Sequence, residues 1–388
     1  MSDIVKKKYC TGCKACYNIC PKDAIEMKTD KEGFWYPKVK AEKCISCDLC
    51  NKVCPSINSC KNPESSIRPE VYAAYSLNEE TRIKSTSGGL FSELANQVIE
   101  NKGYVIGAVY NERHHVEHYI AKSKEELIKL RQSKYVQSDT GNVYKEIKKL
   151  LDKDNLILFC GTPCQIAGLT CFLGKKYEKL ILCDFICRGI ASPKVYEAYL
   201  EMQRNKYKSP IKQVMFKNKT YGWSKLSILI TFENGEEYLQ TGQQDLYVNG
   251  YVQNSFFFRP TCFHCKYKEL PRLSDITLAD FWGIGKTRPH LDQDKGTSLV
   301  FINSTKGKKL FEAIEEDLTF EACTFEEAIN GDVSIFDSVE RNPRRRKFYV
   351  DLDKLPFDKL MEKYSKKAVN LLIRDKFKAG LLKLKHIV

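Results

Sequence analysis

Eight cysteines near the start of the chain repeat one spacing twice, and this repeat constrains the fold more than any other feature of the sequence. Each run reads Cys-x2-Cys-x2-Cys-x3-Cys-Pro, and the two runs occupy residues 10–21 and 44–55. Three closely spaced thiolates can share one metal cluster when the loop wraps around it, while the fourth cysteine and its proline lead away to a second cluster. The start of the chain is therefore expected to be a small module built on two inorganic clusters.

This is the spacing of bacterial ferredoxins with two [4Fe-4S] clusters, in which the fourth cysteine of each run binds the cluster of the other run. Disulfides would need an oxidising compartment, and structural zinc favours isolated Cys-x2-Cys pairs, so electron transfer is the better interpretation. Asp48 stands in the second run where glycine is common, and its charge is expected to lower the reduction potential there. The first cysteine set is Cys10, Cys13, Cys16 and Cys54, and the second cysteine set is Cys44, Cys47, Cys50 and Cys20.

Length, charge and hydropathy limit the class of protein. With 388 residues the chain is expected to hold two or three domains. It contains neither a signal-peptide pattern nor a run of about 18 apolar residues, which predicts a cytoplasmic protein without a transmembrane segment. Seventeen cysteines without an export signal favour a reducing and anaerobic cytoplasm. The net charge of +14 comes without a nucleic-acid motif, so an acidic redox partner such as ferredoxin is favoured over nucleic acid.

Composition and hydrophobic periodicity divide the chain into four parts. Residues 1–57 form the ferredoxin module, with strands expected at 24–27 and 34–39. Residues 58–70 are a linker rich in serine, proline and charge, in which Cys60 is interpreted as a bystander. Residues 71–345 form a catalytic body, and residues 346–388 form a basic helical tail. The tail could contact a membrane surface peripherally, but packing on its own domain is the favoured interpretation.

The body alternates between apolar strands and helices, which predicts a mixed α/β (or α+β) fold with a sheet covered on both faces. The histidines at 114, 115 and 118 are interpreted as part of a polar strand face. Strands are expected at 71–76, 104–110, 156–160, 180–185, 276–281 and 298–303, and helices at 88–101, 125–131, 142–151 and 306–316.

Three motifs in the body carry chemistry. Ser85–Gly89 precedes a helix, where hydroxyls and free N–H groups bind anions, although such a stretch can also be a simple helix cap. Cys164 follows an apolar strand and opens a helix, a position that lowers a thiol pKa. The Cys262-x-x-Cys265 pair lacks two metal ligands. It is therefore either a redox pair or half of a third [4Fe-4S] site completed by Cys164 and Cys187.

Taken in order, the motifs resemble the coenzyme F420 hydrogenase/dehydrogenase beta-subunit family over about residues 71–316. The motifs that carry this resemblance are Ser87-Gly88-Gly89, Ser133–Gln137, Gly161–Gln165, Cys187 with Gly189 and Ser192-Pro193, Cys262-x-x-Cys265, Ile276–Gly283 and Lys295–Ser298.

The resemblance implies FAD bound in the α/β body and a further [4Fe-4S] cluster beside it. The third cysteine set that it implies is Cys164, Cys187, Cys262 and Cys265. The residues that it places near the flavin are Ser87, Gly88, Gly89, Lys134, Gln137, Thr162, Lys295 and Ser298. No catalytic residue is assigned.

The function implied is that of a ferredoxin- or coenzyme F420-linked, flavin-dependent oxidoreductase. Electrons would pass between the clusters and FAD, and a hydride would pass from FAD to a small-molecule or deazaflavin acceptor, because a flavin converts between one- and two-electron chemistry. The alternative is an electron-transfer beta subunit of a larger hydrogenase or dehydrogenase complex.

Overall fold

The two-fold repeat of the cysteine runs is visible in the backbone of the N-terminal module. The computed structural model describes residues 4–58, 60, 68–329 and 333–365. In each run the residues flanking the second cysteine have left-handed φ angles: 74° at Gly12 and 65° at Lys14, and 53° at Ser46 and 61° at Asp48. These residues turn the chain so that the sulfurs of one run can face one point. A short helix follows each turn, α1 (Ala15–Ile19) and α2 (Leu49–Lys52).

A two-stranded hairpin connects the two runs. Strands β1 (Ile25–Thr29) and β2 (Trp35–Val39) pair antiparallel, with Ile25 opposite Val39. Both strands lie within two residues of the expected positions. The hairpin and the two helices together form the ferredoxin-like part of the mixed α/β fold, and a 3-10 turn, η1 (Lys7–Tyr9), precedes the first run.

The body is built on an eight-stranded sheet with the order β13-β3-β12-β11-β7-β6-β4-β5. The four central strands β11, β7, β6 and β4 are parallel, and the flanking strands pair antiparallel. The carboxyl ends of the parallel strands therefore open at one edge, where ligands bind in such sheets. The strands are β3 (Glu70–Ser76), β4 (Tyr104–Tyr110), β5 (Val116–Ala121), β6 (Ile157–Cys160), β7 (Leu180–Phe185), β11 (Ile276–Asp280), β12 (Ser298–Ile302) and β13 (Leu318–Cys323).

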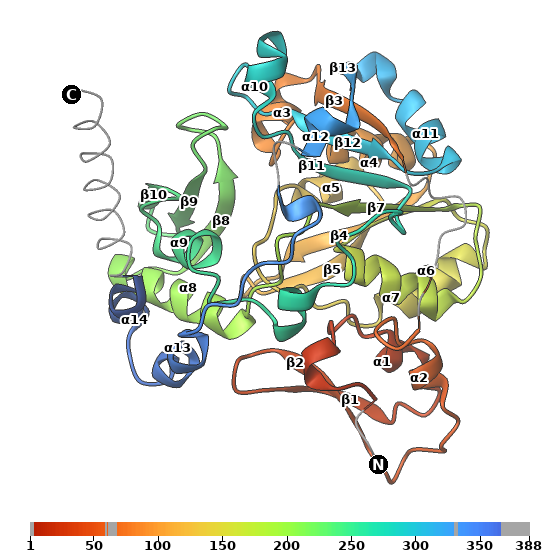
Figure 1. The fold of residues 1–388 in the computed structure, drawn as a ribbon, viewed down its shortest axis with the longest axis vertical. Coiled ribbons are helices and arrows are strands. Elements are labelled where there is room, and N and C mark those ends of the chain that lie inside the picture. Colours follow the sequence, from red (N-terminus) through yellow and green to blue (C-terminus); the bar gives the residue numbers. More distant parts are fainter. Residues whose placement is uncertain (1–3, 59, 61–67, 330–332, 366–388) are drawn as a thin grey trace, which may run out of the picture.

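Helices cover both faces of this sheet, as the continuous apolar strands predict. Val105 packs on one face with α4 (Leu90–Glu100), α5 (Lys124–Leu130) and α11 (Thr305–Glu312). Its neighbour Ile106 packs on the other face with α6 (Val143–Leu151) and α7 (Pro163–Leu173). Cys13, Ala15 and Val53 belong to this second core, so the ferredoxin-like module docks on the α6–α7 side of the sheet (Figure 1).

A smaller antiparallel sheet, β10-β9-β8, lies beside the main one and packs in an aromatic-rich core. The first part of the tail packs in this core through Phe348, Leu360 and Met361, as the favoured interpretation expects. Residues 366–388 lie outside the described residues. This region comprises β8 (Ile211–Asn218), β9 (Ser227–Phe232), β10 (Glu237–Thr241), α8 (Pro193–Tyr207), α9 (Leu246–Val252), α13 (Arg345–Leu352) and α14 (Phe357–Ser365).

Two expectations differ from the structure. The helix expected at 306–316 ends at Glu312, and the chain then enters the unpredicted edge strand β13. Only His118 of the three histidines lies in a strand, because His114 has a left-handed φ of 59° in the preceding turn. Among the described residues, no helix combines the length and hydropathy needed to cross a membrane. The remaining short helices of the described residues are α3 (Glu79–Lys84), α10 (Ile284–Thr287), α12 (Phe325–Ile329) and the 3-10 turns η2 (Pro260–His264), η3 (Pro289–Leu291), η4 (Glu315–Asp317) and η5 (Val333–Ile335).

Candidate iron–sulfur and cofactor sites

The structure brings the four sulfurs of the first cysteine set together around one cavity. All four cysteines are buried. Burial raises the pKa of Cys13 to about 11, and Cys10 and Cys54 act in the same direction because their sulfurs are close. Four buried thiols cannot all ionise without a positive centre among them, and a metal cluster supplies one. The donor set therefore fits a [4Fe-4S] cluster.

The second cysteine set lies at the surface of the module. Cys47 is exposed, and Cys20, Cys44 and Cys50 are half-buried. Burial raises the pKa of Cys50, and the neighbouring Asp48 and Cys44 raise it further. This set is therefore accessible from solvent, and Asp48 places a negative charge beside it.

The third cysteine set lines a second cavity, although its members come from three distant segments. Cys164 lies in the first turn of α7, Cys187 follows β7, and Cys262 and Cys265 lie in and after η2. Burial raises the pKa of Cys187 to about 12, with Cys262 and Cys265 next in effect. The four thiols thus face one another as in the first set.

Two buried cations also line this cavity, which suits a negatively charged cluster. Lys268 is 9% exposed and Arg272 is 6% exposed. Lys268 Nζ donates to the Ser334 carbonyl at 2.6 Å, and Arg272 Nη1 donates to the Tyr267 carbonyl at 2.8 Å. Arg272 Nε also lies 3.5 Å from Oδ2 of the buried Asp184, so part of its charge is offset within the protein. Both cations still add positive potential beside the thiolate ligands.

The first and third sets are separated by a thin wall. Thr11 lines both cavities. Helix α7, which begins beside Cys164, also backs the first set, because a Cβ at Gly168 would lie 2.8 Å from Cys13 Sγ. Burial is the main cause that raises the pKa of Tyr267, and the nearby Cys164 and Cys13 raise it further, so this ring lies close to both sets.

The residues that the resemblance places near a flavin come from several segments, and most of them bond to other parts of the protein. Ser87, Gly88 and Ser298 are together, but they bond within the protein: Ser87 Oγ donates to the Thr297 carbonyl at 2.7 Å, and Gly88 N donates to Ser298 Oγ at 2.9 Å. The glycine at 88 is required by this packing, because a Cβ there would lie 2.4 Å from the Ala74 carbonyl oxygen. Gly89 (φ 96°) precedes α4, and Lys295 pairs with Glu79 at 2.5 Å.

The other predicted flavin residues also have partners within the protein, and the segment of Lys134 reaches that of Ser87, because Ser133 N donates to Thr86 Oγ1 at 2.8 Å. Lys134 Nζ donates to the carbonyls that end α5, the nearest being that of Arg131 at 2.7 Å. Thr162 caps α7, with its N–H donating to Gln165 Oε1 at 2.9 Å. Gln137 accepts from Arg259 Nη1 at 3.1 Å. These contacts all lie within the protein, and FAD binding by these residues stays a prediction.

Three features were not foreseen. Lys219 Nζ donates to the carbonyls of Arg82, Ser87 and Lys295, at 2.6, 2.6 and 2.7 Å, and burial lowers the pKa of this amine to about 7. Arg259 joins the module to the body, although its place three residues before Cys262 could have marked it.

The interpretation of Cys60 as a bystander is wrong, because Cys60 forms a disulfide with Cys171 of α7, with their Cα atoms 6.0 Å apart.

Comparison with protein families shows where the chain belongs. The N-terminal and C-terminal parts of the coenzyme F420 hydrogenase/dehydrogenase beta subunit match residues 71–145 and 154–328. The chain belongs to this beta-subunit family. A 4Fe-4S dicluster domain matches residues 9–58, so this family member carries an N-terminal iron–sulfur domain and is of the oxidoreductase type.

A comparison with solved structures finds weakly similar chains. One chain from the F420-reducing [NiFe] hydrogenase complex of Methanosarcina barkeri is 17% identical, with a TM-score of 0.46, and the match covers 80% of this chain and 94% of that chain. A comparison with curated proteins finds no match.

Proposed function

We propose that this beta-subunit family member is an electron-transfer oxidoreductase in which three cysteine sets each hold a [4Fe-4S] cluster. When bound, such clusters accept and release single electrons at potentials set by their surroundings. The observation that carries the proposal is that Thr11 lines both cavities, which supports a short distance between the first and third sets. The second set is the exposed one, so the sets form a path from the surface to the interior of the body.

A basic surface suits an acidic redox partner such as ferredoxin. Lys6, Lys8 and Lys266 are exposed around Tyr9, which is itself 41% exposed. These lysines lower the pKa of Tyr9, and the hydrogen bond with Lys8 is the largest cause. The Tyr9 carbonyl accepts from Ser56 Oγ at 2.8 Å, which ties this surface to the end of the second run. Long-range attraction between opposite charges speeds such docking and weakens with added salt.

Flavin binding, and with it hydride transfer to a small molecule or a deazaflavin, is a second candidate. It is favoured by two buried polar groups in one segment, Ser85 Oγ and Arg82 Nη2, which lack a hydrogen-bond partner among the described residues. Such groups can await a ligand. A chain without flavin would instead suit an electron-transfer subunit of a larger complex, and the native mass of the purified protein distinguishes the two arrangements.

Anaerobic purification with quantification of iron, sulfide and flavin tests the proposal. Three clusters require about twelve irons per chain, and Cys187→Ser should leave about eight. Cys323→Ser is the matched control, because Cys323 is half-buried in β13, outside all three sets, and should leave about twelve. A wild-type protein with about eight irons, unchanged by Cys187→Ser, rejects the third set. One flavin per chain supports FAD, and flavin-free protein rejects it.

A further inference from the structure

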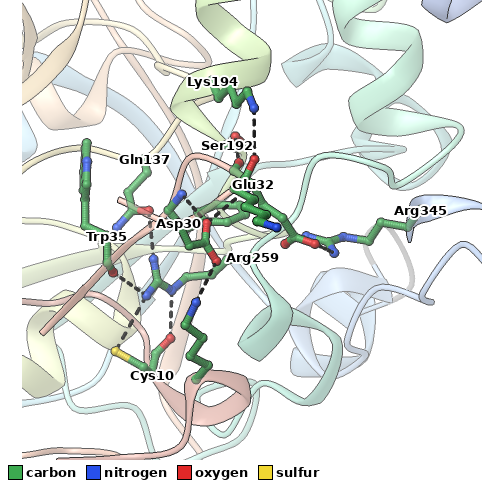
Figure 2. A network of polar contacts seen from close by, with 12 residues as sticks. Cys10, Asp30, Glu32, Trp35, Gln137, Ser192, Lys194, Arg259 and Arg345 are labelled. Atoms are coloured by element: carbon green, nitrogen blue, oxygen red, sulfur yellow. Dashed lines mark hydrogen bonds and ion pairs between the residues drawn. The ribbon is translucent and has the colours of Figure 1, made fainter. Parts of the chain in front are cut away.

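Arg259 is a completely buried cation at the junction between the ferredoxin-like module and the body. Its side chain is 0% exposed. Arg259 Nε donates to the Cys10 carbonyl and Nη2 to the Trp35 carbonyl, both at 2.7 Å, and Nη1 donates to Gln137 Oε1 at 3.1 Å. Arg259 Nη2 also lies 3.6 Å from Cys10 Sγ, within the reach of a hydrogen bond to sulfur. Figure 2 shows the guanidinium enclosed by Cys10, Trp35 and Gln137.

The acceptors of this guanidinium, in the part of the chain that the structure describes, include no carboxylate. The two nearby acidic residues are engaged elsewhere: Asp30 accepts from the Glu32 and Phe34 N–H groups of its own turn, and Glu32 pairs with Arg345. The Tyr36 ring lies 4.3 Å from the guanidinium and offers only its face. A buried cation is costly without a counter-charge, and the Cys10 sulfur is the acceptor here that carries negative charge when it binds a metal.

The backbone of Arg259 links the same point to the third cysteine set. Its N–H donates to the Ile190 carbonyl and its carbonyl accepts from the Cys262 N–H, both at 2.9 Å. Ile190 N in turn donates to Cys262 Sγ at 3.3 Å. Arg259 is therefore held rigidly between the first and third sets, with its charge directed at the first.

We propose that Arg259 is a counter-charge of the first cysteine set, beside the cationic Lys14 that lines the same cavity, and raises the reduction potential there above that of the second set. The inference rests on the proposed function. Reduction adds one negative charge and no proton, so a cation beside Cys10 favours the reduced state of the first set. At the second set, Asp48 follows Cys47 directly and immediately precedes α2, and its negative charge disfavours the reduced state there. One electron leaving the second set is thus drawn inward to the first, and Arg259 acts as a positioning and tuning residue.

Redox titrations followed by electron paramagnetic resonance on the anaerobic full chain test this role. Arg259→Met should move the first-set potential to more negative values by at least about 59 mV, a tenfold change in a one-electron equilibrium constant, while the second-set potential stays unchanged. Arg259→Lys should shift the first-set potential less than Arg259→Met does, because lysine keeps the charge but not the fork of donors. Arg345→Met is the matched control: it removes a buried arginine whose partner is Glu32, and it should leave both potentials unchanged.

A second variant keeps the test decisive if Arg259→Met does not fold. Gln137→Glu keeps the shape of the side chain and places a carboxylate against Arg259 Nη1. The added negative charge offsets that of the guanidinium, so the first-set potential should fall as in Arg259→Met. Either variant with full iron content and wild-type potentials overturns the inference and leaves the proposed function intact. A wild-type protein that binds far fewer than about eight irons per chain overturns the proposed function itself, because the first and second sets would then not hold two clusters.

Discussion

The contact between Glu32 and Arg345 predicts how firmly the hairpin of the module is held. Arg345 donates from Nη1 to Glu32 Oε1 at 2.7 Å and from Nη2 to Glu32 Oε2 at 2.6 Å, and Nη2 also donates to the Phe258 carbonyl at 2.8 Å. The Arg345 side chain is 2% exposed, whereas that of Glu32 is 25% exposed. Figure 2 shows this fork reaching the hairpin turn from the side of the body.

The cost of Arg345→Met follows from these exposures. Breaking a fully buried ion pair costs about 3–5 kcal/mol, because the remaining charge is left unpaired. Glu32 can be partly hydrated after the change, which reduces the expected cost to about 2 kcal/mol. A free-energy change of this size corresponds to a factor of about 30 in a local opening equilibrium.

Hydrogen exchange of the full anaerobic protein measures this opening. In Arg345→Met, amides of the hairpin at 30–36 should exchange about 30-fold faster, while those of α4 keep their wild-type rate. Glu32→Gln and the double variant complete a cycle, in which the second change should cost much less once the first has been made. Fully additive effects, or unchanged exchange in the hairpin, would refute the reasoning.

Two further predictions concern the surroundings of the cysteine sets. Gly168→Ala should lower the thermal midpoint and the iron content together, because the added Cβ would lie 2.8 Å from both Cβ and Sγ of Cys13; wild-type values for both would contradict this packing. Burial lowers the pKa of His118 to about 4 from an ordinary value of 6.5, so its neutral ring contributes stability in full above pH 6.5 and loses it as the pH falls toward 4. Between pH 6.5 and pH 4, the free energy of unfolding should therefore fall by about 1–3 kcal/mol less in His118→Phe than in wild type. An identical pH dependence of the two proteins would argue against a neutral, buried His118.

Short-range patterns predicted much of the fold. The strands at 104–110 and 180–185 occur at the expected residues, because continuous apolar runs have few alternatives to a buried strand. Strand β13 was missed because its sequence, LTFEAC, mixes polar and apolar residues as an edge strand can. The cysteine spacing likewise predicted the turn that gathers Cys10, Cys13 and Cys16, since that turn depends only on neighbouring residues. Cys54 joins them from the second run, as the repeat predicts.

The wider site depends on contacts between residues far apart in the sequence, which no local pattern contains. Arg259 contacts Cys10 across 249 positions and Gln137 across 122. The resemblance grouped Gln137 with Ser87, yet Arg259, from a distant segment of the same body, holds Gln137 at the module junction. Lys219 has no motif around it, and its three carbonyl partners converge only after the loops at 82–87 and 295 have packed.

Helix α7 limits how the module and the body could be recombined. Cys164 lies in its first turn, Gly168 contacts the module one turn later, and Cys171 bonds to Cys60 near its end. One inserted residue would rotate everything beyond it by about 100° and turn Gly168 away from Cys13. Homologous chains with this architecture should therefore show no length variation between these positions. A foreign two-cluster module could be grafted here only if its second cysteine met a glycine at this level of the helix.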